Sequence, residues 1–182
     1  MSNVIIELTF ATLEDALPVA QIHVAAWRAA YQNIIPTAYL AALSVDDRAA
    51  RWRSAISENK QALIVAKIEA EVVGWISLGP CRDAGALATQ AEIWALYVSP
   101  DYWGEGIGTA LWQYARDLSL KQGYESVSLW VLSDNVGALR FYESIGMTLD
   151  LTKTEQVTIG GKSLNEVCFL FFHSELARFT KL

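Results

Sequence analysis

The sequence predicts a single domain over residues 1–182, of the mixed α/β (α+β) class, with a mostly antiparallel central sheet flanked by helices. Three observations support this prediction. Segments with strand-like and helix-like patterns alternate along the chain, without a linker, an internal repeat or a low-complexity tract. The chain has 182 residues, of which 53% are hydrophobic, so it can bury one substantial core. A strand, a glycine-rich turn and a helix follow one another between residues 92 and 122.

The predicted helices are amphipathic and are bounded by capping residues. The first begins at a capping box formed by Thr12 and Asp15, and Pro18 is expected to interrupt it near its start. Gly123 and Gly146 are expected to end two later helices, because glycine readily adopts the left-handed conformation found after a helix. In chain order, the predicted helices span residues 12–31, 37–43, 46–57, 110–122 and 135–145.

The predicted strands are short runs rich in β-branched and aromatic residues. Gly74 predicts a bulge or a close contact inside its strand, and Gly160 with Gly161 predicts the turn of a C-terminal hairpin. In chain order, the predicted strands span residues 4–10, 62–68, 72–78, 92–98, 126–132, 148–159 and 163–172. The pattern of residues 173–182 fits a short helix and a frayed end equally well.

The stretch from Glu92 to Ala110 organises the rest of the chain. Its strand ends at Ser99-Pro100-Asp101, and glycines follow at positions 104, 106 and 108 before a helix begins. Glycines let the backbone approach a ligand, and free N–H groups at a helix N-terminus favour an anion. The stretch lacks the lysine of a P-loop, and its Gly-x-Gly-x-Gly spacing differs from the dinucleotide fingerprint. From these residues alone, the stretch fits an anion site of another class and a plain strand-to-helix turn equally well.

A second motif later in the chain identifies that class. Together, Trp103 to Gly108 and Asn135 to Met147 resemble the two signature motifs of the GNAT superfamily of acetyl-CoA-dependent N-acetyltransferases. The family patterns are Arg/Gln-x-x-Gly-x-Gly/Ala and a later Asn-x-x-Ala-x-x-Phe-Tyr-Glu-x-x-Gly-Phe, and here Met147 replaces the final aromatic residue. Trp103 stands where the family usually has Arg or Gln. Pyrophosphate binding must therefore depend more strongly on backbone N–H groups.

The resemblance implies a splayed pair of central strands, in which residues 92–98 separate from residues 126–131 and the pantetheine of acetyl-CoA enters the wedge. The N–H groups of residues 103–109 would hold the pyrophosphate, and an N–H near Leu96 or Tyr97 would face the thioester oxygen. A bulge is expected in this strand, and no metal is implied. The implied cofactor-binding residues are Leu96, Tyr97, Val98, Trp103, Gly104, Glu105, Gly106, Ile107, Gly108, Thr109, Asn135 and Tyr142.

The same resemblance implies two catalytic residues. Tyr142 matches the family tyrosine that donates a proton to the departing thiolate. Glu92 precedes Trp103 by eleven residues, the spacing of a catalytic glutamate in some members, and would act as the general base. The residues alone also allow Tyr142 to pack on the sheet and Glu92 to be a solvated residue at a strand end. Asn135 is expected to contact the cofactor, to cap its helix, or to do both.

The acceptor site is less sharply defined. In the family, the segment between the first two strands forms one wall of this site. Trp27 and Tyr31, with Tyr39 and Trp52, are therefore candidates for an acceptor pocket, although an aromatic stripe is more often core. The leading hypothesis is transfer of the acetyl group to a primary amine of a small molecule, by direct attack in a ternary complex. The alternatives are acetylation of a protein N-terminus or lysine, and a non-catalytic acyl-CoA-binding module.

Composition narrows the partners and the compartment. A net charge of −6 argues against nucleic acid and is compatible with a cationic substrate. No apolar run is long enough to cross a membrane, and residues 1–10 lack the basic region of a signal peptide, so a cytoplasmic location is expected. Cys81 and Cys168 lack metal-ligand spacing and are expected to be reduced. The seven tryptophans are compatible with a homodimer interface as well as with a large core.

Overall fold

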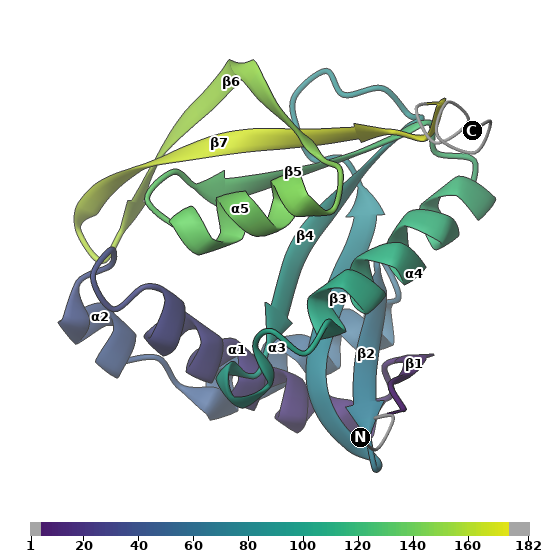
Figure 1. Ribbon diagram of the computed structural model, residues 1–182. Coiled ribbons are helices and arrows are strands. Elements are labelled where there is room, and N and C mark those ends of the chain that lie inside the picture. The colour runs from purple at the N-terminus through teal and green to yellow at the C-terminus, as the bar shows by residue number, and fades with distance from the viewer. Residues whose placement is uncertain (1–4, 175–182) are drawn as a thin grey trace.

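The structure is a computed structural model that describes residues 5–174. At its centre is a seven-stranded sheet with the order β1-β2-β3-β4-β5-β7-β6 (Figure 1). The strands are β1 (Glu7–Phe10), β2 (Ala62–Ile68), β3 (Glu71–Pro80), β4 (Gln90–Val98), β5 (Ser126–Leu132), β6 (Thr148–Ile159) and β7 (Lys162–Phe172). The helices are α1 (Ala16–Ala30), α2 (Thr37–Ala41), α3 (Val45–Glu58), α4 (Ile107–Lys121) and α5 (Val136–Ser144), with two short 3₁₀ turns, η1 (Leu13–Asp15) and η2 (Pro100–Tyr102). The predicted fold class is confirmed.

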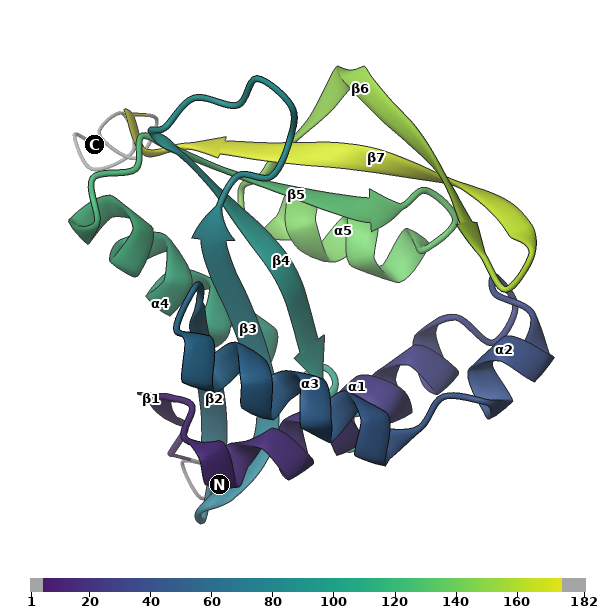
Figure 2. The same cartoon turned by 180° about the vertical axis from the view of Figure 1, so that it is seen from behind.

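Helices cover both faces of the sheet. In Figure 1, α4 and α5 lie on the near face, and Figure 2 shows α1 and α3 on the opposite face. Leu111 and Trp112 of α4 belong to the core of the first face, together with strand residues such as Leu129. Val19 of α1 packs against Trp75 of β3 in the core of the second face. The sheet is therefore held between two apolar cores, one on each face.

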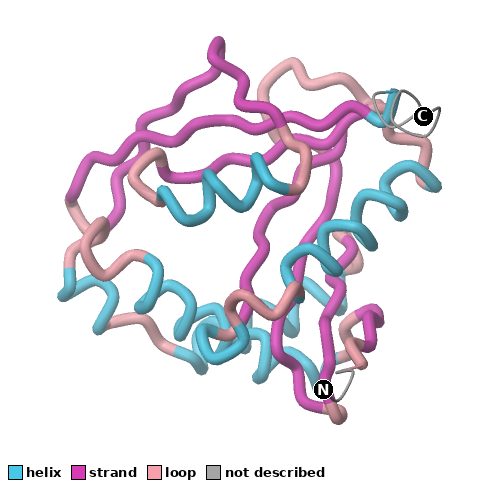
Figure 3. The backbone as a smooth tube through the Cα atoms, in the orientation of Figure 1, coloured by secondary structure: helices cyan, strands magenta, loops and turns pink. Residues whose placement is uncertain are grey.

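The sheet divides at its centre. β4 and β5 are the one parallel pair among the described strands, and they pair only where Gln90–Glu92 meet Ser126–Ser128. Beyond Glu92 the two strands separate into a wedge, which is visible between them in Figures 1 and 3. Every other neighbouring pair in the sheet is antiparallel. The splayed central strand pair implied by the sequence motifs is confirmed.

A β-bulge changes the direction in which the backbone groups of β4 point. Ile93 pairs with Leu78 and Ala95 pairs with Ser77, so Trp94 is an extra residue that faces no partner on β3. Such a bulge shifts the alternation of the strand and increases its bend. The bulge expected in this strand is therefore present, three residues before Tyr97. Gly74 on β3 is also a close contact, because a Cβ there would lie 3.1 Å from Cγ2 of Ile107.

Most elements form within one or two residues of their predicted bounds, with three differences. β1 begins at Glu7, and residue 4 of the predicted strand, like residues 175–182 of the tail, lies outside the described residues. Pro18 does not interrupt a helix, because it lies in the first turn of α1, where a missing N–H group is tolerated. α4 begins at Ile107 instead of residue 110, directly after Gly106. Among the described residues, no helix has the length and apolar character needed to span a membrane.

Candidate active site

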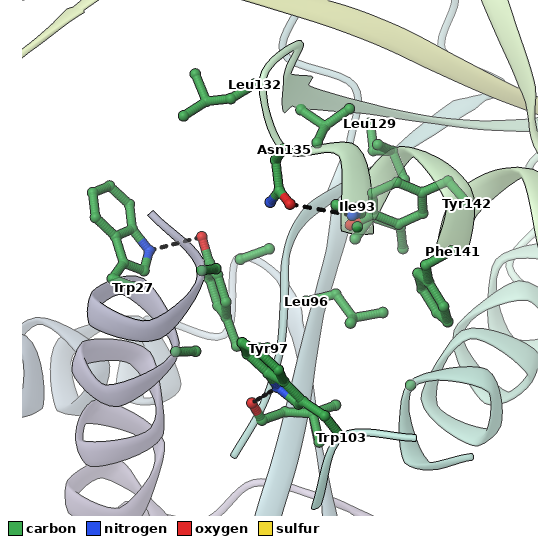
Figure 4. A pocket seen from close by; sticks show the side chains of 18 of the residues that line it. Trp27, Ile93, Leu96, Tyr97, Trp103, Leu129, Leu132, Asn135, Phe141 and Tyr142 are labelled. Carbon is green, nitrogen blue, oxygen red and sulfur yellow. Dashed lines mark hydrogen bonds between the residues drawn. The ribbon is translucent and has the colours of Figure 1, made fainter. Parts of the chain in front are cut away.

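The wedge between β4 and β5 opens into a cavity of about 670 Å³. Residues of the two strands line its sides, the turn before α4 lines one end, and residues of α5 and α1 contribute further walls (Figure 4). The lining is largely apolar and aromatic, with a few polar groups. Such a cavity is typical of a small-molecule or cofactor site. Its residues come from segments that are distant in the sequence, from Ala26 to Glu166.

The glycine turn brings backbone donors to one end of the cavity. Gly106 has φ +80°, a left-handed conformation that turns the chain from η2 directly into α4. Gly108 needs its missing side chain for a different reason, because a Cβ there would lie 3.1 Å from Cζ of Phe141 on α5. The two glycines therefore position the N-terminus of α4 against the cavity and let α5 approach it closely.

Most N–H groups of the turn are free to bind an anion. Trp103 and Glu105 donate their N–H groups within the turn, to the carbonyls of Pro100 and Tyr102 at 3.3 and 3.4 Å. Among the described residues, the other N–H groups between 103 and 109 have no hydrogen-bond acceptor. These groups lie at residues 104, 106, 107, 108 and 109, and all five residues line the cavity. The cradle thus consists of five backbone donors at a helix N-terminus, where the helix dipole also favours an anion.

The inner edge of β4 supplies a second row of backbone groups. Ser99 donates its N–H to the carbonyl of Val73 at 2.8 Å, so Ser99 and Tyr97 face β3 in the antiparallel ladder. Because orientation alternates along a strand, the N–H and carbonyl groups of Leu96 and Val98 face the wedge. They can pair with a chain lying in the wedge as with an added strand. Between Leu96 and Tyr97, the geometry selects the N–H of Leu96 as the one directed into the cavity.

Trp103 occupies part of this inner edge. Its indole Nε1–H donates to the carbonyl of Val98 at 2.9 Å, while the side chain remains 50% exposed (Figure 4). Trp103, which replaces the usual Arg or Gln, therefore forms a hydrogen bond to the backbone of β4 at the wedge. It does not supply a positive charge for a phosphate.

Trp103→Arg is expected to tighten CoA binding by about fivefold at low salt and to make binding more salt-sensitive. A guanidinium adds a charge-assisted bond to the pyrophosphate, but at this exposed site its contribution should be only about 1 kcal/mol. Calorimetry at two salt concentrations measures both effects. Trp103→Gln is the matched control, because it removes the indole without adding charge and should leave the salt dependence unchanged. Weaker binding by Trp103→Arg would show that the indole itself contacts the cofactor.

Tyr142 lies on the wall of the cavity opposite Trp27. Its ring packs against Phe141 and Phe169, with centroid distances of 5.3 and 5.8 Å, and none of the described residues bonds its hydroxyl. Burial, together with the nearby Tyr31, raises the pKa of Tyr142 well above the usual value for tyrosine. The phenol therefore stays protonated throughout the neutral and mildly alkaline range. Tyr142 is therefore a buried phenol that lines the cavity, with a hydroxyl that none of the described residues bonds.

Aromatic and amide side chains form the wall between Tyr142 and α1. Trp27 donates its indole N–H to the hydroxyl of Tyr97 at 2.8 Å (Figure 4). Tyr31 lies beside them, where burial raises its pKa and interactions with Tyr97 and Asn135 lower it by less. Asn135 accepts a hydrogen bond from the N–H of Ala138 at 3.2 Å and also lines the cavity. The prediction that Asn135 caps its helix is confirmed.

The structure places Glu92 away from this cavity. Its side chain is 2% exposed and lines a second, smaller pocket of about 390 Å³. Its carboxylate accepts the backbone N–H of Arg82 at 2.8 Å and pairs with the Arg82 guanidinium through Nε and Nη2. The alternative that Glu92 is a solvated residue at a strand end is contradicted, because its side chain is buried.

Most of the other predicted site residues line the cavity, and a few do not. Every implied cofactor-binding residue except Glu105 lines the cavity, and so do Trp27 and Tyr31. Tyr39 and Trp52 do not line it: Tyr39 belongs to a cluster with Tyr31, and Trp52 packs against Trp75 in a core with a centroid distance of 4.6 Å. Lining residues that the sequence motifs do not indicate include Ile93, Trp94, Leu129, Trp130 and Glu166.

Cys81, Asp83 and Glu92 approach one another, with one ligand atom of each lying within 4.8 Å of the others. Asp83 is already bonded to Lys153 at 2.8 Å and Glu92 to Arg82. Two cations therefore neutralise the two carboxylates, and the cluster resembles an ion-pair network more than a metal site.

The groups around the wedge fit acetyl-CoA. Five free N–H groups suit the pyrophosphate, and the unpaired edge of β4 suits the amide-containing pantetheine arm. Tyr142 adds a protonated phenol to the same cavity. A wedge with these parts defines an enzyme of the acyltransferase class that draws its acyl group from coenzyme A.

Comparison with known proteins agrees with this class. The model of the Acetyltransferase (GNAT) family matches residues 21–147. The chain is 30% identical over 158 residues to the uncharacterized N-acetyltransferase YuaI of Bacillus subtilis, covering 86% of this chain and 87% of that protein. The chain therefore belongs to the GNAT family and is an acetyl-CoA-dependent N-acetyltransferase.

Solved structures share the fold at low sequence identity. The paia N-acetyltransferase of Thermoplasma acidophilum, in complex with coenzyme A, aligns with a TM-score of 0.72 at 21% identity, over 95% of this chain and 100% of that one. The yncA protein of Salmonella typhimurium, with its cofactor acetyl-CoA, aligns with a TM-score of 0.70 at 19% identity, over 92% and 94%. At these identities the likeness supports the fold alone.

Proposed function

We propose that this enzyme acetylates the primary amine of a small molecule by direct attack in a ternary complex with acetyl-CoA. The proposal rests on one observation: the main cavity is continuous from the turn before α4 to the aromatic wall at α1. Trp27 and Tyr31 stand in this wall, and the hydrogen bond from Trp27 to Tyr97 braces it. Such a wall suits a compact acceptor better than a polypeptide. Cofactor and acceptor can occupy the cavity together, as direct transfer requires.

When bound, acetyl-CoA supplies an activated acetyl group as a thioester. In the proposal, the free N–H groups of the α4 turn hold its pyrophosphate and the inner edge of β4 aligns its pantetheine. The N–H of Leu96 stabilises negative charge as it develops on the carbonyl oxygen during attack. Tyr142 gives its proton to the departing sulfur. Asn135 and Val98 orient the cofactor at the mouth of the wedge.

For the proton that the amine loses, the proposal retains Glu92 as the base. Its carboxylate lies in the smaller pocket, which shares Ile93, Trp94, Trp130 and Glu166 with the main cavity. Transfer to Glu92 would therefore pass through that shared boundary. Arg82, whose side chain is 57% exposed, would have to release the carboxylate in the process.

Glu92→Gln is expected to lose activity mainly at low pH, by about tenfold near pH 6, and to recover towards wild type near pH 9.5. The reason is that most of an aliphatic amine is protonated at low pH and needs a base, whereas free amine becomes available as pH rises. The measurement is the ratio of wild-type to variant rates across this range. A ratio that stays constant with pH would assign deprotonation to water or to another residue.

The proposed function is tested by a screen of primary amines with detection of released CoA thiol. Turnover with small amines supports it. Turnover confined to peptides with a free N-terminus or a lysine would reassign the acceptor to a protein. If no amine or peptide in the screen accelerates the release of CoA thiol, both the small-molecule acceptor and the protein acceptor are contradicted.

Two further expectations belong to this proposal. We propose a cytoplasmic location, supported by the two cysteines, neither of which forms a disulfide. The homodimer suggested by the tryptophan content stays a prediction, which sedimentation can measure.

A further inference from the structure

The cavity contains one charged side chain. Among the described residues that line it, only Glu166 carries a formal charge, and the others are apolar, aromatic or neutral polar. Glu166 lies on β7, where it stands opposite Leu132 of β5 in the ladder. A single carboxylate in a largely apolar cavity is costly to bury unless a cation joins it there.

No cation among the described residues forms an ion pair with Glu166, although Arg82 lies near enough for its charge to act on that carboxylate. Arg82 forms its ion pair with Glu92, and Lys153 donates to Asp83 at 2.8 Å. Among the described residues, Glu166 has neither an ion-pair partner nor a side-chain hydrogen bond. Glu155 stands directly opposite it on β6, and two like charges in such a cross-strand pair repel. Burial and Glu155 together raise the pKa of Glu166, and the charge of Arg82 lowers it by less.

The position of Glu166 also fits an acceptor. It lies where the main cavity meets the smaller pocket, and Trp94 and Trp130 line both spaces at this boundary. Trp130 is held in place by its N–H bond to Asp83 at 2.9 Å. Tyr31, already proposed for the acceptor wall, lies near enough to Glu166 to be affected by its charge. A carboxylate with aromatic faces beside it is the chemistry that recognises an ammonium group.

We infer that Glu166 is the specificity-determining residue of the acceptor site and binds the ammonium form of an aliphatic amine. This inference rests on the proposed function, and it narrows the substrate class to amines that are cationic at neutral pH. Aromatic amines, which are neutral at that pH, gain nothing from the carboxylate. Loss of the ammonium proton before attack is a separate step, tested by the Glu92→Gln profile.

The test compares two small amines of similar shape, benzylamine as the cation and aniline as the neutral amine. Glu166→Gln keeps the side chain's size and removes its charge. It is expected to raise KM for benzylamine by about tenfold, the usual effect of losing one charge-assisted contact, with kcat changed much less. KM for aniline and the affinity for acetyl-CoA should not change, and unchanged cofactor affinity also shows that the variant is folded.

Two matched variants sharpen the result. Glu166→Asp retains the charge and should keep the preference for benzylamine. Glu155→Gln removes the neighbouring exposed carboxylate, which borders only the smaller pocket, and should change KM by much less than Glu166→Gln.

The outcomes separate the two proposals. If amines are acetylated but Glu166→Gln alters both KM values equally, or neither, the inference is overturned and the proposed function stands. If wild type releases no CoA thiol with any amine, the proposed function is overturned and the inference with it.

Discussion

Tyr142→Phe is expected to lower kcat by roughly 10- to 10³-fold while acetyl-CoA still binds. The change removes only a hydroxyl, and that hydroxyl has no partner among the described residues, so no internal bond is lost. What is lost is the proton that Tyr142 is proposed to give to the departing thiolate. Because the pKa of Tyr142 is raised, the wild-type enzyme should show no alkaline decline due to this residue up to about pH 9.5.

The measurement is kcat with thiol detection, together with acetyl-CoA affinity by calorimetry. Tyr124→Phe is a suitable control, because Tyr124 packs against the same core but does not line the cavity. It should retain wild-type turnover. Unchanged kcat in Tyr142→Phe would reduce Tyr142 to a packing residue against Phe169.

Gly106→Val is expected to weaken acetyl-CoA binding by at least about 2 kcal/mol, or roughly 30-fold. No atom lies within 4 Å of a Cβ placed on Gly106, so the loss does not arise from a clash inside the protein. It arises because valine is strained at φ +80° and because its side chain would project beside the N–H cradle. Calorimetry on the folded variant measures the effect.

Gly85→Val separates strain from cofactor contact. Gly85 has φ +78°, nearly the same as Gly106, and also has open space around a Cβ, but it lies outside the cavity. Both variants should lose similar stability on heating, and only Gly106→Val should lose affinity. Equal affinities for the two variants would remove the α4 turn from the pyrophosphate site.

Much of the fold follows from local patterns. The hairpin at Gly160-Gly161 and the strand 126–132 appear at their predicted positions, because turn chemistry and β-branched runs are local signals. The start of α4 was missed by three residues, since it depends on the conformation of Gly106. Pro18 was misjudged because a proline is disruptive only beyond the first turn, and periodicity does not place that turn.

In the candidate site, too, the residues in local motifs were predictable and those placed by long-range contacts were not. Most of the proposed cofactor-binding residues were predictable because they lie in two sequence motifs, at 103–108 and 135–147, and the family resemblance also indicated residues 96–98 of the strand before them. Glu166 belongs to neither motif and reaches the cavity only through the pairing of β7 with β5. The partnership of Glu92 with Arg82 was equally invisible, because it depends on how the loop before β4 folds back. The residues proposed for the acceptor side of the site are thus brought together by contacts between segments that are distant in the sequence.

The split between β4 and β5 has a consequence for association through strand edges. An unpaired strand edge normally invites edge-to-edge association, and proteins block such edges with charges, prolines or coverings. Here the open edge of β4 lies inside the molecule, and strand pairing with β5 closes the wedge at Gln90–Glu92. A second polypeptide strand would have to enter a narrowing gap with α5 on one side. The indole of Trp103 already occupies the last carbonyl of the edge, at Val98. A gap that closes at Gln90–Glu92 therefore leaves less room for another polypeptide strand than an open sheet edge would.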